Sequence, residues 1–269
     1  MKILGKHFQE GETAMNIGFL GTSWAVSTGE RDNTSILIES DNTSVLVDCP
    51  GNAWGKLLKM GRDPLGLDAI FITHGHVDHV YGLPSLSEMM RLSGRERSLP
   101  IYVGEDFFEL TVKLLDLFEI RNHPGSFNIE PIRVSYETSH FVIKDLTVET
   151  FLVNHTVRNL ALKFCDGRKS VVYSSDTAFH ASLAEFARNS EALMHEATMS
   201  AKLGDACREG HSTPSEAAKI AEMARVKQLF LVHVGFSVDK HPEKAVEEAR
   251  KIFKGNVVVP RDLEIYSIR

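Results

Sequence analysis

Three histidines and one aspartate within six residues constrain the possible folds of this chain more than any other feature. They lie in the segment THGHVDH at 73–79, which directly follows the apolar run AIFI. Such a run predicts a strand, so the segment is expected in the loop that leaves the strand's carboxyl end, where ligand sites of open sheets gather. Imidazole and carboxylate groups are donors that zinc and related cations accept. We therefore expect a fold in which this loop forms part of a metal site.

The spacing within the segment divides its donors between two ions. In an extended loop, residues i and i+2 point the same way, so His74 and His76 can bind one ion. Asp78 and His79 follow in the next turn and can serve a second ion. Gly75 lets the backbone approach the metal without an intervening side chain.

Six residues cannot complete two coordination shells, so further ligands are expected downstream. His155, Asp176 and His233 each follow an apolar run, as His74 does. A single polar residue at a strand end is more often simply solvated, but the shared placement favours a common site. The predicted ligands are His74, His76 and His155 for one ion, Asp78, His79 and His233 for the other, and Asp176 as a bridge. Two ions about 3.5 to 4 Å apart would bind a water molecule between them and deprotonate it. The resulting hydroxide would make this a hydrolase site.

Glu196 and His211 form a second candidate pair, in the segments HEAT at 195–198 and GHST at 210–213. A carboxylate hydrogen-bonded to an imidazole fixes the tautomer and raises the pKa of the imidazole, which suits it to protonate a leaving group. Helix capping is the competing interpretation, because Thr198, Ser212 and Thr213 are good N-cap residues and Pro214 is a good first helical residue. The residues alone leave both interpretations open.

The order of the elements predicts one layered α/β (α+β) domain. Short aliphatic and β-branched runs predict strands, and apolar residues at three- and four-residue steps predict helices. Strands are expected at 16–22, 34–39, 44–48, 69–73, 101–103, 228–233 and 256–259, helices at 105–118, 178–188, 214–225 and from Pro242, and further strands within 129–173. Two sheets packed face to face, with helices on both outer faces, satisfy this order. We assign residues 1–15 to an N-terminal extension and 16–269 to the domain.

Composition excludes several other classes of protein. No apolar run reaches the roughly 18 residues of a membrane span, so no membrane partner is expected. The net charge of −6 supplies no general attraction for phosphate backbones. Three widely spaced cysteines without a CxxC pair favour a reducing, cytoplasmic setting.

With these motifs the chain resembles the metallo-β-lactamase superfamily, and within it the tRNase Z (ribonuclease Z) branch. THGHVDH matches the signature loop of the superfamily, and GFLGTS at 18–23, HEAT and GHST are more specific to the branch. The resemblance covers residues 16–268. It implies a four-layer αββα sandwich, two zinc ions and a homodimer. It also implies a catalytic water oriented by Asp78 and a proton shuttle formed by Glu196 and His211.

Two departures from the branch bear on the substrate. Bacterial tRNase Z carries a long tRNA-gripping arm between the ligands that match His155 and Asp176, whereas only 20 residues separate them here. The Ser and Arg-Tyr that usually follow the last histidine are replaced by Val234-Gly235-Phe236-Ser237-Val238. We therefore expect a phosphodiesterase whose substrate is a small molecule or an RNA end, smaller than whole tRNA.

Other functions fit the same sequence. A lactonase, thioesterase or arylsulfatase of the superfamily would keep the metals and cleave a different bond, since fold does not decide substrate. A non-catalytic RNA-binding or scaffolding relative is a further alternative, and it would be expected to lose ligands. Manganese or iron can replace zinc on His and Asp ligands.

Overall fold

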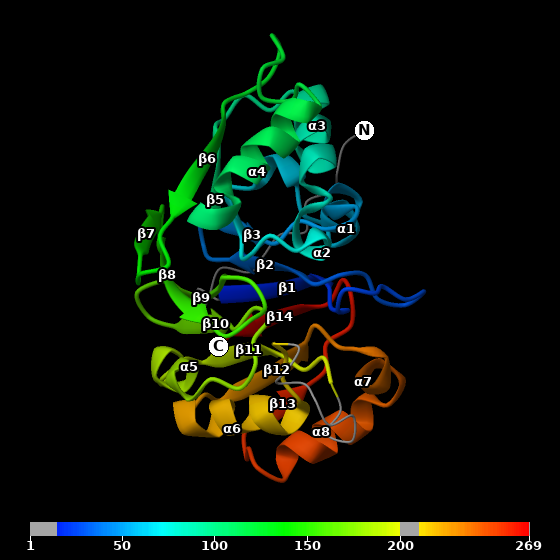
Figure 1. Cartoon of the computed structure of the whole chain (residues 1–269), viewed down its shortest axis with the longest axis vertical. Coiled ribbons are helices and arrows are strands. Elements are labelled where there is room, and N and C mark those ends of the chain that lie inside the picture. Colours follow the sequence, from blue (N-terminus) through cyan, green and yellow to red (C-terminus); the bar gives the residue numbers. More distant parts are fainter. Residues whose placement is uncertain (1–14, 200–209, 269) are drawn as a thin grey trace.

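The computed structural model describes residues 15–199 and 210–268, and it holds two sheets packed face to face (Figure 1). Each sheet has seven strands, in the orders β14-β1-β2-β3-β4-β5-β6 and β13-β12-β11-β10-β9-β8-β7. Helices cover the outer face of each sheet (Figure 1). The predicted αββα architecture is confirmed.

The observed strands lie close to the ranges expected from the sequence. In the first sheet they are β1 Met15–Gly21, β2 Ser35–Glu39, β3 Ser44–Val47, β4 Ala69–Ile72, β5 Leu99–Gly104, β6 Ile129–Val134 and β14 Ile265–Ile268. In the second they are β7 His140–Ile143, β8 Leu146–Val153, β9 Asn159–Cys165, β10 Ser170–Tyr173, β11 Ala192–Glu196, β12 Gln228–Val232 and β13 Asn256–Val258.

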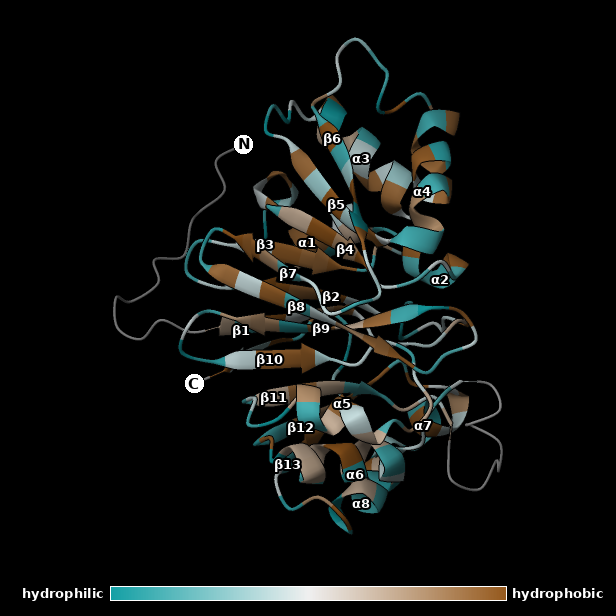
Figure 2. Cartoon of the chain, turned by 60° about the vertical axis from the view of Figure 1, so that its left-hand side comes forward, coloured by the Kyte–Doolittle hydropathy of each residue, from teal (hydrophilic) through white to brown (hydrophobic). Residues whose placement is uncertain are grey.

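The four layers follow from strands that are apolar on both faces. In β3, Val45 and Val47 face the core between the sheets, while Leu46 faces the helices outside. In β10, Val171 faces the central core and Val172 the other outer layer. Hydrophobic residues run along the strands of both sheets (Figure 2). A strand that is apolar on both faces must be covered on both faces, and this produces the sandwich.

Helices fill the two outer layers. They are α1 Ala53–Lys59, α2 Val77–Val80, α3 Leu83–Leu92 and α4 Glu105–Leu117 in the first half, and α5 Ala181–Phe186, α6 Pro214–Ala224, α7 Phe236–Lys240 and α8 Pro242–Arg250 in the second, with a short 3₁₀ turn at Pro64–Gly66. The cap of α6 is a capping box, in which Thr213 accepts from the backbone N–H of Glu216 and the Glu216 side chain accepts from that of Thr213. The capping interpretation is therefore right for Thr213.

Strand direction brings the predicted ligand loops together. β3 and β4 are parallel, and so are β10, β11 and β12. β9 is antiparallel to both β8 and β10, so β8 runs in the same direction as β10. The carboxyl ends of β8, β10, β11 and β12 therefore share one edge of the second sheet. Loops that are distant in sequence meet there.

Some elements were not anticipated from the sequence. β14 pairs with β1 at the edge of the first sheet, and its run IYSI is broken by a serine, with only Ile268 buried. The five-residue α7 is too short for a helical pattern. The N-terminal extension, apart from Met15, and Cys207 lie outside the described residues. In the described part of the chain, no helix is long and apolar enough to cross a membrane.

Candidate metal centre

The first predicted ligand group comes together at the carboxyl ends of β4 and β8. Nδ1 of His76 lies 3.0 Å from Nε2 of His74 and 3.2 Å from Nε2 of His155. Ligand nitrogens about 2.0 to 2.1 Å from a tetrahedral zinc lie about 3.3 Å from one another. Both distances are close to this value, and the ligand atoms of all three residues lie within 4.8 Å of one another.

The second group lies beside the first. Nε2 of His79 lies 3.4 Å from Oδ2 of Asp78, and Nε2 of His233 lies 3.7 Å from the same oxygen. Asp78 and His79 belong to the short helix α2, whereas His233 follows β12 in the opposite sheet. The two sheets thus each contribute donors to this group.

Asp176 lies between the two groups. Its Oδ2 lies 3.2 Å from Nε2 of His233 and 3.4 Å from Nε2 of His79. The same oxygen lies 3.9 Å from Nε2 of His74 and 4.0 Å from Nε2 of His155. One carboxylate therefore reaches imidazoles of both groups, as a bridging ligand must.

The unsatisfied atoms at this site fit a cation. Within the described residues, Nε2 of His79, Nε2 of His233 and Oδ1 of Asp176 are buried and form no hydrogen bond. Buried polar atoms are normally satisfied, because an unpaired one costs about 1 to 3 kcal/mol. These atoms carry lone pairs, and they belong to three residues whose side chains lie within 3.4 Å of one another through Oδ2 of Asp176. The His and Asp cluster therefore fits a metal site.

Contacts through Nδ1, on the far side of the ring from the cluster, orient His79 and His155. Nδ1 of His79 lies 2.7 Å from Oδ2 of Asp48, and Nδ1 of His155 lies 2.8 Å from the carbonyl oxygen of Gly210. Asp48 also accepts from the backbone N–H of Thr73, at 2.8 Å. Such partners fix the tautomer and direct Nε2 of these two rings toward the candidate metal site. Asp48 was not identified from the sequence as a site residue, although it follows β3 just as the histidine loop follows β4.

Glu196 and His211 meet at the edge of this cluster. Nδ1 of His211 lies 2.8 Å from Oε1 of the fully buried Glu196. Oε2 of Glu196 accepts from the hydroxyl of Thr198 at 2.9 Å, and the same hydroxyl lies 2.8 Å from Nδ1 of His233. Thr198 therefore links the Glu196–His211 pair to a predicted ligand. Sequence reasoning considered Thr198 only as a helix cap.

The electrostatics of the first donor group and of Asp176 suit metal binding at neutral pH. Burial lowers the pKa values of His74, His76 and His155, so these imidazoles stay neutral and keep their lone pairs. Burial alone would raise the pKa of Asp176, but His233 and His79 outweigh it and hold that pKa well below its ordinary value. The carboxylate therefore remains ionised.

Two glycines shape the loops that carry these ligands. A Cβ on Gly75 would lie 2.4 Å from Cδ2 of Phe107, so the ring of Phe107 fills the space where a side chain would stand. Gly75 thus lets α4 pack against the histidine loop. Gly210 has φ of +74°, and a Cβ there would lie 2.8 Å from Nδ1 of His155. The contact that orients His155 requires a glycine.

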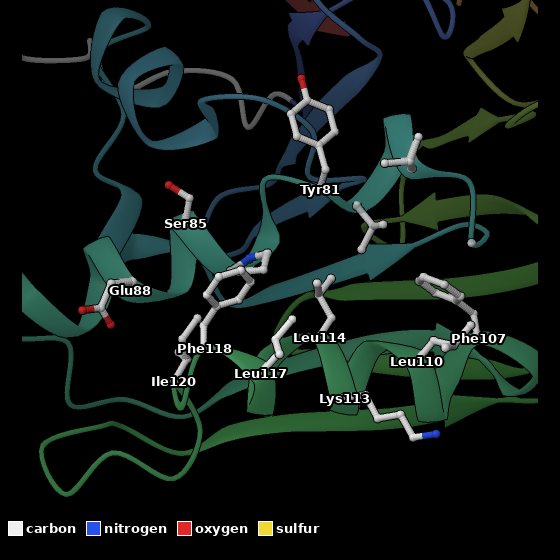
Figure 3. Close-up of a pocket in the computed structure, with 14 residues that line it drawn as sticks. Tyr81, Ser85, Glu88, Phe107, Leu110, Lys113, Leu114, Leu117, Phe118 and Ile120 are labelled. Atoms are coloured by element: carbon white, nitrogen blue, oxygen red, sulfur yellow. The ribbon is translucent and has the colours of Figure 1, made fainter.

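An apolar groove of about 970 Å³ adjoins the histidine loop through Gly75 and Val77. Its walls come from α2, α3 and α4 (Figure 3). Phe107 and Leu110 lie toward one end, and Leu117, Phe118 and Ile120 toward the other (Figure 3). The lining is mostly hydrophobic, with Tyr81, Ser85, Glu88 and Lys113 as its polar side chains. The groove lies beside the predicted ligands, and its lining includes none of them.

Comparison with known proteins agrees with the fold and the motifs. Ribonuclease Z of Methanothermobacter thermautotrophicus is 29% identical, over 89% of this chain and 92% of that protein. The metallo-β-lactamase fold protein YhfI from Bacillus subtilis superposes with a TM-score of 0.83 at 24% identity, over 95% of this chain and 100% of that one. The short form of human tRNase Z gives a TM-score of 0.79 at 21% identity, over 95% and 100% of the two chains. The resemblance to ribonuclease Z and to the metallo-β-lactamase fold is confirmed.

One family model covers most of the domain. It is described as "Anti-Pycsar protein Apyc1" and matches residues 15–254, from β1 to just beyond α8. The matched range contains both donor groups, Asp176, Glu196 and His211. The chain therefore belongs to the family of the anti-Pycsar protein Apyc1.

Proposed function

We propose that this protein is a metal-dependent hydrolase of the ribonuclease Z type and that it cleaves phosphodiesters. The observation that supports this most strongly is the position of Asp176, whose Oδ2 lies within 4.0 Å of four imidazole nitrogens from both donor groups. Relatives named ribonuclease Z, at 24% to 29% identity over most of the chain, support the same chemistry.

Two divalent ions, zinc in the first instance, are part of the proposal. We assign His74, His76 and His155 to one, Asp78, His79 and His233 to the other, and Asp176 to both. When bound, such ions activate a water molecule and stabilise charge on the phosphate oxygens. Manganese or iron would suit the same donors. Elemental analysis of the purified protein measures both the identity and the number of the ions.

Three side chains carry the proton and water chemistry in this proposal. The carboxylate of Asp78 orients the attacking water. His211 holds a proton on its imidazole and delivers it to the departing oxygen. Glu196, at 2.8 Å from Nδ1 of His211, orients that ring and stabilises its charged form. His211 also lies near Asp176 and His233 in a third potential donor group, so metal content must be measured when it is changed.

The substrate we propose is smaller than tRNA. β9 and β10 form a hairpin between the loops of His155 and Asp176, closed by a turn in which Gly167 has φ of +84°. This connection is too short to carry a tRNA-gripping arm. The net charge of −6 also disfavours a long phosphate backbone. A small phosphodiester or an RNA end fits these features.

Hydrolysis of model compounds tests the reaction. The metal-loaded protein should cleave bis(p-nitrophenyl) phosphate and leave a lactone, a thioester and a sulfate ester largely intact. Turnover of one of those compounds without phosphodiester cleavage would shift the assignment to another hydrolase. A metal-free protein inactive on all four would favour a scaffold. Because the chain belongs to the family of the anti-Pycsar protein Apyc1, we also propose that it counteracts Pycsar. The wild-type protein should do so, and the His211→Ala variant should not.

We further propose a homodimer formed through the groove between α3 and α4. Leu110, Leu117 and Phe118 are 55%, 74% and 61% exposed along one side of it, and Val77 is 70% exposed at its end. Contiguous exposed apolar surface of this kind marks interaction sites. Sedimentation should give twice the chain mass, and Leu117→Glu with Phe118→Glu should give a monomer.

A cytoplasmic location completes the proposal. Cys49 and Cys165 are free thiols, as expected in a reducing compartment. Cell fractionation of the tagged protein tests this.

A further inference from the structure

Trp24, in the loop after β1, and Phe236, at the start of α7, form an aromatic pair that the chemistry above does not use. Their ring centroids are 5.5 Å apart and their planes meet at 80°, an edge-to-face arrangement. Phe236 is 53% exposed and Trp24 is partly exposed. Large aromatic side chains usually bury most of their area. This pair instead presents ring surface to solvent.

The pair is tied to both loops of the second donor group. The backbone N–H of Trp24 donates to the carbonyl of Val234, the residue after His233, at 3.3 Å. Its own carbonyl accepts from Nδ2 of Asn33 at 2.6 Å, and Oδ1 of Asn33 accepts from the hydroxyl of Tyr81 at 3.2 Å. Tyr81 lies two residues after His79. Trp24 therefore bridges the segments that follow two predicted ligands.

Hydrogen bonds of neighbouring residues also fix the position of Phe236. It is the first residue of α7, and the preceding Gly235 donates its N–H to the carbonyl of Thr198 at 3.2 Å. A Cβ on Gly235 would lie 2.3 Å from that oxygen, so the contact is close. Nε of Arg31 donates to Oδ1 of Asp239 at 2.6 Å, which joins α7 to the loop that carries Trp24. The two rings are thus held on segments that adjoin the loops of the second donor group.

A polar atom of the pair also lacks a partner. Nε1 of Trp24 is buried and forms no hydrogen bond with any residue in 15–199 or 210–268. An indole N–H is a donor only, and a buried one normally finds an acceptor. Within these residues the indole N–H is therefore left without an acceptor.

We propose that Trp24 and Phe236 form the nucleobase-binding subsite of this protein. The inference rests on the proposed phosphodiesterase function: a nucleotide whose phosphate lies at the metal centre would place its base on these rings. Base stacking on aromatic rings is tolerant of sequence, because every base has a π-face. The pair thereby makes nucleoside phosphodiesters better substrates than simple alkyl esters.

Two substrates that share a leaving group test the subsite by kinetics. Thymidine 5′-(p-nitrophenyl phosphate) and methyl p-nitrophenyl phosphate both release p-nitrophenol, and only the first carries a base. Trp24→Leu and Phe236→Leu should lower the ratio of their kcat/KM values about tenfold. Trp24→Phe should retain most of the ratio, and Phe108→Leu on α4 should leave it unchanged. If wild type cleaves both esters and no variant alters the ratio, the subsite is wrong while the phosphodiesterase stands.

Fluorescence tests the subsite without catalysis. The chain has two tryptophans, so Trp54→Phe leaves Trp24 as the single indole. Thymidine 5′-phosphate should quench its emission in a saturable way, and ribose 5-phosphate, which has no base, should not. The added Phe236→Leu change should weaken binding of thymidine 5′-phosphate about tenfold. Equal responses to the two phosphates, or none, would overturn the subsite even if neither ester is cleaved.

Discussion

His211 and Glu196 pair across 15 residues of sequence, with Nδ1 of the imidazole 2.8 Å from Oε1 of a carboxylate that has no exposed surface. The side chain of His211 is 15% exposed, so one member of the pair is buried and the other reaches the opening of the site. This is the arrangement of a proton donor held by an internal carboxylate.

His211→Ala should lower kcat by about 10² to 10⁴, the usual contribution of general acid catalysis. Metal content by elemental analysis should stay at the wild-type value, because the proposed ligands are intact. Loss of metal in this variant would place His211 among the ligands, contrary to the role assigned to it.

Thr198→Val should lower activity or metal affinity about 10- to 100-fold, the usual cost of losing a partner of a metal ligand. The change removes the hydroxyl that lies 2.8 Å from Nδ1 of His233 and 2.9 Å from Oε2 of Glu196. Thr198→Ser keeps that hydroxyl and should restore most of the activity. Equal loss in both variants would mean that packing of the methyl group, and not the hydroxyl, matters.

Asp176→Ala should remove metal from both positions, because this carboxylate is the proposed bridge. Ligand binding stabilises a folded protein by mass action, so the gain in Tm on adding zinc should also shrink. Metal analysis and thermal unfolding with and without chelator measure the two effects. Asp41→Ala, in the exposed turn between β2 and β3, is the control and should match wild type. Retention of full metal content by Asp176→Ala would exclude the bridge.

Gly75→Ala should destabilise the protein by about 1 to 3 kcal/mol, the usual cost of overpacking. The new methyl group would lie within 2.9 Å of three ring atoms of Phe107. Phe107→Leu should relieve this clash, so the glycine change should cost less in that background. Urea unfolding of the four proteins in a double-mutant cycle gives the coupling. Additive effects would show that the clash is relieved by backbone movement instead.

His195 should make stability depend on pH. It lies on the opposite face of β11 from Glu196, is fully buried, and has its pKa lowered by burial. As pH falls below the ordinary imidazole pKa of about 6.5, the unfolded chain binds a proton that folded His195 does not. The free energy of unfolding should then decrease by up to about 1.4 kcal/mol per pH unit. Urea unfolding of chelated protein between pH 7 and 5.5 should show a smaller decrease for His195→Leu than for wild type.

The layers and most of the predicted ligand cluster were predictable because their signals are local. An unbroken apolar run such as VLV or AIFI is a property of neighbouring residues, and it identifies a strand covered on both faces. The spacing of His74, His76, Asp78 and His79 is equally local. For His155, Asp176 and His233 the signal was a shared position after an apolar run, and strand direction then brought all three to one edge.

The partners that orient these residues depended on the tertiary structure. Asp48 meets His79 across 31 residues and Thr198 meets His233 across 35, because β3 lies beside β4 and β11 beside β12. No local pattern specifies which strands become neighbours, since hydrophobic burial is non-directional and many pairings satisfy it. The contact between Trp24 and Phe236 likewise exists only because a loop of one sheet reaches the end of a strand in the other. Periodicity and spacing thus determined the layers and the donors, while strand order decided what surrounds them.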